Sequence, residues 1–151
     1  MSDAFVGLGA NLGDRSGNLR AGLRLLRGPR LRLRALSTFR RTRPVGGPPQ
    51  PDYVNAVARF ETGLPPRELL GRLLWVGDRL GRRRTVRNGP RTLDLDLLVY
   101  PGAELDEPGL TLPHPRLSDR RFVLEPLAEI APGLRLAGGR TPAELLRRLD
   151  S

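Results

Sequence analysis

Two aspartates separated by a single leucine follow closely after a run of arginines. Asp94 and Asp96 lie in the segment from Thr92 to Tyr100, which alternates polar and apolar residues and then becomes continuously apolar. This period-two pattern predicts a strand with one buried face, so both carboxylates point to the same side with their backbones roughly 6–7 Å apart. Without a cation between them, mutual repulsion of the two carboxylates would weaken the strand. The spacing therefore predicts a metal site.

The arginines upstream of this strand supply the complementary chemistry. They are Arg82, Arg83, Arg84, Arg87 and Arg91, and Gly89-Pro90 predicts a tight turn among them. Guanidinium groups offer planar donor pairs that match phosphate oxygens. Taken singly, the aspartates could be the solvated face of an edge strand and the arginines an unspecific basic surface. Because the chain brings both features into one short stretch, we interpret them as a Mg-nucleotide site.

The composition restricts the chemistry further. The 151 residues predict a single domain, and the absence of cysteine means that a metal must be held by oxygen or by the one histidine. This favours a hard cation such as Mg²⁺. All 26 basic residues are arginine, which excludes a Walker-type lysine and Schiff-base chemistry. The net charge of +10 fits an anionic partner, either nucleic acid or a small polyphosphate.

No targeting or membrane-spanning segment is recognisable in the sequence. The residues after Met1 lack a basic region followed by a long apolar run, and no segment approaches eighteen unbroken apolar residues. We expect a cytoplasmic protein.

Strands and helices alternate along the chain that positions these groups. Strands are predicted over residues 3–9, 31–39 and 52–62, and helices over 18–27, from 65 to about 81, from 118 with an interruption at Pro126, and over 141–149. Gly7 and Gly9 indicate close backbone packing in the first strand. The Pro/Gly-rich segment 41–51 is interpreted as a functional loop. We expect Trp75 to be a core or edge packing residue.

Tyr53, Asn55 and Val57 share one face of the strand predicted over 52–62. An aromatic ring and an amide on one face could hold a planar heterocycle. On spacing alone, a half-buried tyrosine beside a hydrogen-bonded asparagine is the simpler interpretation.

Several sequence blocks together resemble one enzyme family. They are Gly9-Ala10-Asn11-Leu12-Gly13-Asp14, Arg41-Thr42, Pro51-Asp52-Tyr53-Val54-Asn55, Gly81-Arg82, Gly89-Pro90-Arg91-Thr92-Leu93-Asp94-Leu95-Asp96, Leu112-Pro113-His114 and Leu124-Glu125-Pro126-Leu127-Ala128-Glu129-Ile130-Ala131-Pro132. In this order, through nearly the whole chain, they are similar to 6-hydroxymethyl-7,8-dihydropterin pyrophosphokinases.

The resemblance implies an α+β fold with a ferredoxin-like core, in which helices flank an antiparallel sheet, as a single pyrophosphokinase domain over residues 1–151. It implies transfer of the β,γ-pyrophosphoryl group of ATP to the pterin hydroxymethyl oxygen with release of AMP, a step of folate biosynthesis. The implied partners are these small molecules, without nucleic acid or membrane, and the chain is expected to be a monomer.

The resemblance also implies roles for individual residues. Asp94 and Asp96 would bind two Mg²⁺ ions and, with Arg82 and Arg91, form the catalytic set. The ATP-binding residues would be Arg82, Arg84, Arg91, Leu97, Thr111, His114 and Arg120, with Leu97 and Thr111 on the adenine side. The pterin-binding residues would be Thr42, Pro44, Val45, Tyr53, Asn55 and Phe122, with the ring between Tyr53 and Phe122.

Several positions depart from the family pattern. Gly77 stands where relatives commonly carry a glutamate, and Asn88, Thr85 and Pro115 replace a tryptophan, a basic residue and a tyrosine. The loop from Arg84 to Gly89 is one residue shorter. We expect these changes to affect loop closure and affinity more than the reaction. Two alternatives stay open at this point: a basic ferredoxin-like nucleic-acid-binding module, and a homologue that has lost catalysis and is kept for an interaction.

Overall fold

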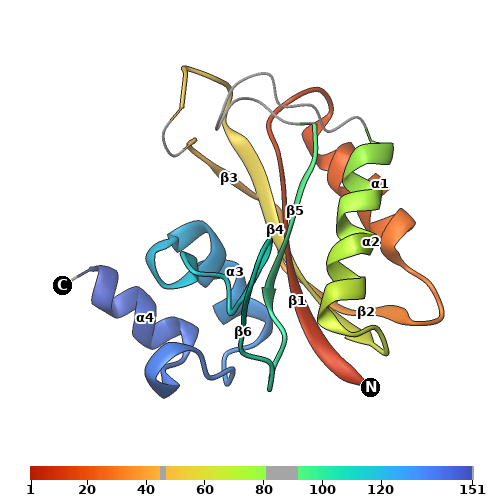
Figure 1. The fold of residues 1–151 in the computed structure, drawn as a ribbon. Coiled ribbons are helices and arrows are strands. Elements are labelled where there is room, and N and C mark those ends of the chain that lie inside the picture. Colours follow the sequence, from red (N-terminus) through yellow and green to blue (C-terminus); the bar gives the residue numbers. More distant parts are fainter. Residues whose placement is uncertain (45–46, 81–91, 151) are drawn as a thin grey trace.

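The computed structural model describes residues 1–44, 47–80 and 92–150, which form one main sheet between two layers of helices (Figure 1). The strands are β1 (Ser2–Ala10), β2 (Leu31–Leu36), β3 (Arg40–Thr42), β4 (Tyr53–Thr62), β5 (Asp94–Val99), β6 (Leu105–Glu107) and β7 (Leu110–Leu112). The helices are α1 (Arg15–Leu26), α2 (Pro66–Arg79), α3 (Arg121–Ile130) and α4 (Pro142–Leu149), with 3₁₀ turns at Leu117–Asp119 and Ala137–Gly139.

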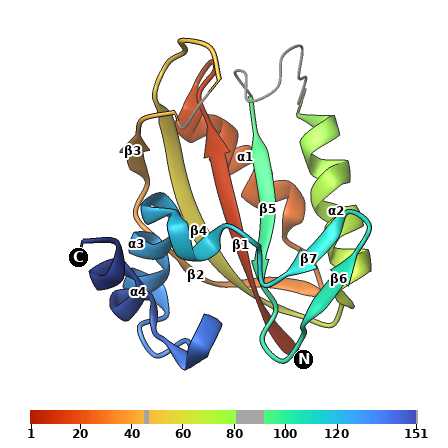
Figure 2. The same cartoon turned by 60° about the vertical axis from the view of Figure 1, so that its left-hand side comes forward.

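The main sheet is antiparallel in every described pairing. Its order is β2-β4-β1-β5, and β3 pairs with β4 on the same side as β2. Helices α1 and α2 cover one face, whereas α3 and α4 lie on the other (Figures 1 and 2). Strands β6 and β7 form a separate hairpin beyond β5. The α+β fold with a ferredoxin-like core predicted from the sequence is confirmed.

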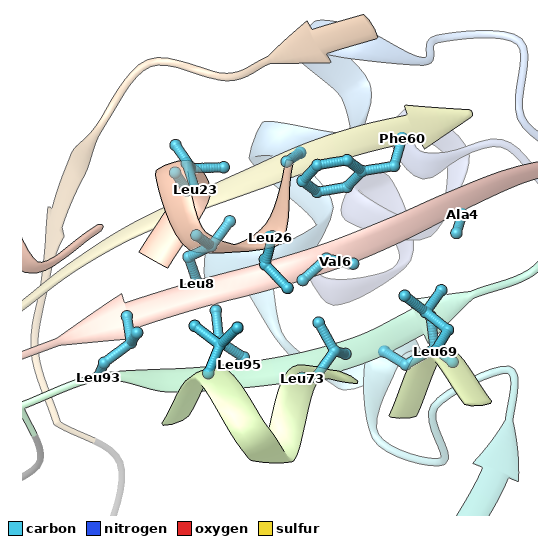
Figure 3. Packing of buried hydrophobic residues seen from close by; sticks show 14 of the residues in the cluster. Ala4, Val6, Leu8, Leu23, Leu26, Phe60, Leu69, Leu73, Leu93 and Leu95 are labelled. Atoms are coloured by element: carbon cyan, nitrogen blue, oxygen red, sulfur yellow. The ribbon is translucent and has the colours of Figure 1, made fainter. Parts of the chain in front are cut away.

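Alternating side chains divide the core into two clusters, one on each side of the sheet. On the α1/α2 side, Leu8, Phe60 and Leu95 pack with helix residues such as Leu23 and Leu73 (Figure 3). Leu98 belongs to the cluster that packs against α3 and α4. Because the side chains of a strand alternate, the leucines on the α1/α2 side leave Asp94 and Asp96 facing the α3 side, as the spacing predicts.

Helix termini follow local capping chemistry. The Asp14 carboxylate accepts a hydrogen bond of 3.0 Å from the Gly17 amide, so α1 begins earlier than the apolar spacing predicts. Thr141 and Glu144 form a reciprocal capping box that confirms the predicted C-terminal helix.

Two local predictions are wrong. The helix predicted from residue 118 is interrupted at its start and not at Pro126. Leu117–Asp119 is a separate 3₁₀ turn, and α3 runs through Pro126. The proline costs the helix one backbone hydrogen bond, and burial of its ring offsets this cost. The segment 41–51 is not loop throughout, because it begins within β3. Trp75 is 47% exposed, with the Arg79 guanidinium 5.2 Å from its ring centroid, which agrees with the edge packing role predicted for it.

Within the described residues, no helix has the length and apolar character needed to cross a membrane.

Candidate active site

A cavity of about 370 Å³ opens over the α3 side of the sheet. Its floor comes from β1, β4 and β5, and its walls come from the β3–β4 connection and the segment leading into α3. The lining residues are Gly7, Leu8, Gly9, Thr42, Arg43, Pro44, Gln50, Tyr53, Asn55, Ala56, Val57, Asp94, Asp96, Leu98, Arg116, Asp119, Arg120, Phe122 and Val123.

Gly9 of β1 lies between β4, which carries Tyr53 and Asn55, and β5, which carries Asp94 and Asp96. Gly9 pairs with Asn55 of β4 on one side and with Asp94 of β5 on the other. Gly7 pairs in the same way with Val57 and Asp96. The central strand therefore contributes no side chain between the two functional strands at these positions, which leaves them joined by one open floor.

Asp94 and Asp96 fit a magnesium site. Both are half-buried on the cavity face of β5. Among the described residues, no group of three or more His, Cys, Asp or Glu side chains is arranged to hold a metal ion. Two carboxylates are nevertheless a normal protein contribution to Mg²⁺, which usually completes its coordination with phosphate oxygens and water. The donor set suits a metal that arrives with a nucleotide.

The opposite side of the cavity carries aromatic and amide groups. Tyr53 of β4 and Phe122 of α3 both line it. Asn55 is 9% exposed, and its Nδ2 donates a hydrogen bond to Oγ1 of Thr42, which fixes the carboxamide between β4 and β3. The Arg120 guanidinium lies 5.5 Å from the Phe122 ring centroid. This arrangement suits a flat heterocycle with polar edges.

His114 lies beside β5, although it does not line the cavity. Its amide donates a hydrogen bond of 2.8 Å to the Leu98 carbonyl, and its Nδ1 accepts one of 3.3 Å from the Arg116 amide. Burial lowers the pKa of His114 below its usual 6.5, and the Arg120 and Arg116 charges add to this, while Asp94 opposes it. The imidazole is therefore neutral at pH 7, with its proton on Nε2, where it can donate a hydrogen bond.

The structure brings together part of the predicted site. The residues that meet at the cavity are Thr42, Pro44, Tyr53, Asn55, Asp94, Asp96, Arg120 and Phe122. Thr111 lies apart in β7, with its hydroxyl 3.5 Å from the Asp106 carboxylate. The Leu97 side chain is 5% exposed and packs in the core on the opposite face of β5. Val45, Arg82, Arg84, Arg91 and the Gly89-Pro90 turn lie outside the described residues.

Four polar residues that line the cavity were not predicted as site residues from the sequence: Arg43, Gln50, Arg116 and Asp119. They follow no periodic pattern, because they stand in connections whose path the sequence does not specify. The interpretation of residues 41–51 as a functional loop was the available signal for Arg43 and Gln50.

The family model described as 7,8-dihydro-6-hydroxymethylpterin-pyrophosphokinase matches residues 5–132, which include every described cavity residue. The chain belongs to this family. Family membership and the enzyme class, both predicted from the sequence, are confirmed.

Individual pyrophosphokinases of the family match over nearly the whole chain. The 2-amino-4-hydroxy-6-hydroxymethyldihydropteridine pyrophosphokinase of Methylorubrum extorquens is 42% identical over 151 residues, covering 99% of this chain and 95% of the relative. The enzyme of the same name from Synechocystis sp. is 43% identical over 97% of this chain and 76% of its own length. That of Pseudomonas aeruginosa is 44% identical over 94% of this chain and 88% of the relative.

Proposed function

We propose that this chain transfers the β,γ-pyrophosphoryl group of ATP to the hydroxymethyl oxygen of 6-hydroxymethyl-7,8-dihydropterin. The observation that carries the proposal is that one cavity joins the Asp94 and Asp96 carboxylates to the Tyr53, Asn55 and Phe122 side chains. A metal-bound polyphosphate and a flat acceptor can therefore lie side by side on one sheet face. Positioning of this kind supplies much of the catalysis in phosphoryl-type transfers.

Asp94 and Asp96 would hold the magnesium that accompanies ATP, and family resemblance suggests two ions. Bound magnesium neutralises charge on the phosphate oxygens. The hydroxymethyl oxygen forms a bond to the β-phosphorus, the bond from that phosphorus to the bridging α-β oxygen breaks, and the hydroxyl proton passes to solvent. The products are AMP and the pterin diphosphate, in a step of folate biosynthesis.

The pterin would lie between the Tyr53 and Phe122 rings. Asn55 would contact its polar edge, supported by Thr42, Pro44 and Val45. Asn55 suits this role because its carboxamide is fixed by Thr42 before substrate binds, so that no ordering of the side chain is required at that moment.

Positive charge on the phosphate side would come from Arg82, Arg84, Arg91 and Arg120, with neutral His114 as a hydrogen-bond donor. Arg82 and Arg91 are proposed as catalytic because cationic donors stabilise charge that develops during transfer. Thr111 and Leu97 would lie on the adenine side. Because the Leu97 side chain is in the core, its contact with a nucleotide would come from its backbone.

Resolution of AMP from ADP tests the proposal. The chain is incubated with ATP, Mg²⁺ and 6-hydroxymethyl-7,8-dihydropterin, and reactions without pterin and without metal serve as controls. AMP that forms only in the complete mixture supports pyrophosphoryl transfer, whereas ADP would indicate ordinary kinase chemistry. If neither AMP nor ADP forms, the proposed catalysis is contradicted. The cytoplasmic location and the monomeric state stay predictions.

A further inference from the structure

We propose that Gly9 is a positioning residue for the pterin, because the absence of a side chain at this position allows the Asn55 carboxamide to take its orientation. The inference rests on the proposed function. Gly9 is buried in β1 and lies in register between Asn55 and Asp94, so it occupies the floor between the acceptor and the metal site.

Space above Gly9 is already filled by Asn55. A Cβ atom at Gly9 would lie 2.6 Å from Asn55 Oδ1 and 3.8 Å from its Cγ. The second-nearest atom would be Cδ1 of Tyr53 at 3.6 Å. A separation of 2.6 Å is well inside van der Waals contact, so any residue other than glycine must displace the carboxamide or separate the two strands.

The Asn55 carboxamide cannot move away without losing a hydrogen bond. Its Nδ2 donates to Oγ1 of Thr42, and Asn55 itself is buried. Rotation of Oδ1 away from position 9 breaks the geometry of this hydrogen bond, because Oδ1 and Nδ2 belong to one planar group. The amide would then no longer present fixed groups to the edge of the pterin.

Gly7 shows that this constraint is local. It shares the cavity floor with Gly9, yet a Cβ atom there would meet the Leu98 side chain at 3.3 Å, where a flexible methyl group can yield. The three nearest atoms to the Cβ position of Gly9 all belong to Asn55 and Tyr53, which lie on the pterin side. Substitution at Gly9 is therefore expected to raise the KM for pterin and to leave the KM for ATP nearly unchanged.

A double-mutant cycle tests whether Gly9 acts through Asn55. Gly9→Ala, Asn55→Ala and the double variant are compared with the wild type by their KM values for pterin and for MgATP. Gly9→Ala is expected to raise the pterin KM by about tenfold, as loss of a fixed hydrogen-bonding group would, and to leave the ATP KM within about twofold. In the Asn55→Ala background the same substitution is expected to change the pterin KM by less than about twofold.

Additive effects in the cycle, or an equal rise in both KM values, would overturn the inference. Gly71→Ala is the matched control, since a Cβ atom at this exposed α2 position meets nothing within 4 Å.

If Gly9→Ala alone is unfolded, the double variant, which lacks the clashing Oδ1, is expected to recover the Tm of Asn55→Ala. Failure to recover it would equally overturn the inference. Absence of pterin turnover in the wild type would contradict the proposed function itself, whereas turnover that Gly9→Ala leaves unchanged would contradict only the role of Gly9.

Discussion

The Asn11 carboxamide holds Gln50 in place from a turn that lies far from it in sequence. Nδ2 of Asn11 lies 2.7 Å from Oε1 of Gln50 and 3.0 Å from the carbonyl oxygen of Pro51. Asn11 is only 2% exposed, and Arg15 adds a hydrogen bond of 2.8 Å from Nη1 to the Asp52 carbonyl. Because Gln50 lines the cavity, the turn between β1 and α1 positions one wall of that cavity.

Asn11→Ala removes both of these hydrogen bonds and leaves the Pro51 carbonyl to find another partner. We expect the free energy of unfolding to fall by about 1–3 kcal/mol, as for other polar groups deprived of a partner, and the KM for pterin to rise more than the KM for ATP. Urea denaturation and steady-state kinetics measure the two effects. Asn18→Ala is the control, because it loses a single exposed hydrogen bond of 2.9 Å to the Leu12 carbonyl. Equal effects of the two substitutions would contradict the role of Asn11.

Substitution of Phe60 tests how much the core on the α1/α2 side contributes to stability. Its side chain is fully buried among residues of β1, α1 and α2 (Figure 3). We expect Phe60→Ala to lower the free energy of unfolding by about 3–5 kcal/mol, because it removes buried apolar area and leaves a cavity. Leu74→Ala, at a position 47% exposed on α2, should cost less than about 1 kcal/mol in the same urea denaturation experiment.

Glu129 connects α3 to the segment between β2 and β3. Its carboxylate accepts hydrogen bonds from the Thr38 amide at 2.9 Å and the Thr38 hydroxyl at 3.0 Å, and from Nη2 of Arg40 at 2.9 Å. The Arg40 hydrogen bond, opposed by partial burial and supported by Thr38, lowers the pKa of Glu129 below its usual 4.5. Since the folded state binds this proton less readily than the unfolded chain, the stabilisation is fully present above pH 4.5 and is lost as the pH falls through the folded pKa.

Glu129→Gln should therefore lower the free energy of unfolding by roughly 0.5–1 kcal/mol at neutral pH, a modest value because the side chain is partly solvated. The difference from wild type should shrink as the pH is lowered below 4.5. Urea denaturation over a pH series measures this difference, with Glu104→Gln, at an exposed position just before β6, as the control. A difference that stays constant across the series would argue against the ion pair as its source.

Much of the fold follows from periodicity in the sequence. The alternation of Leu95 and Leu97 with Asp94 and Asp96 predicts both the strand and the face each side chain occupies, because one buried face fixes the register. The start of α3 was not predictable in this way. Its N-cap position is Arg120, whose side chain makes no capping hydrogen bond, so the usual local signal for a helix start is absent there.

The site was predictable where chemistry and strand spacing coincide. The strand spacing predicts that Tyr53, Asn55 and Val57 share one face, and the family resemblance implies that Tyr53 and Asn55 bind the pterin. The sequence does not show which strands are neighbours, so the position of Gly9 between Asn55 and Asp94 emerges only from the paired strands. The same holds for Asn11 and Gln50, which meet through loops whose path depends on tertiary packing.

The most direct test of the central claim is the rate of AMP formation by Asp94→Asn and Asp96→Asn, measured with saturating pterin and a Mg²⁺ titration. Each substitution keeps the shape of the side chain and removes its charge, so we expect an unchanged Tm to within a few degrees and a fall in kcat of about 100-fold or more. Asp3→Asn is the control, because Asp3 pairs with Arg59 at 3.6 Å near the far end of β1. AMP formation at the wild-type rate by either cavity variant, with the same dependence on Mg²⁺, would contradict the assignment of this carboxylate pair as the metal site.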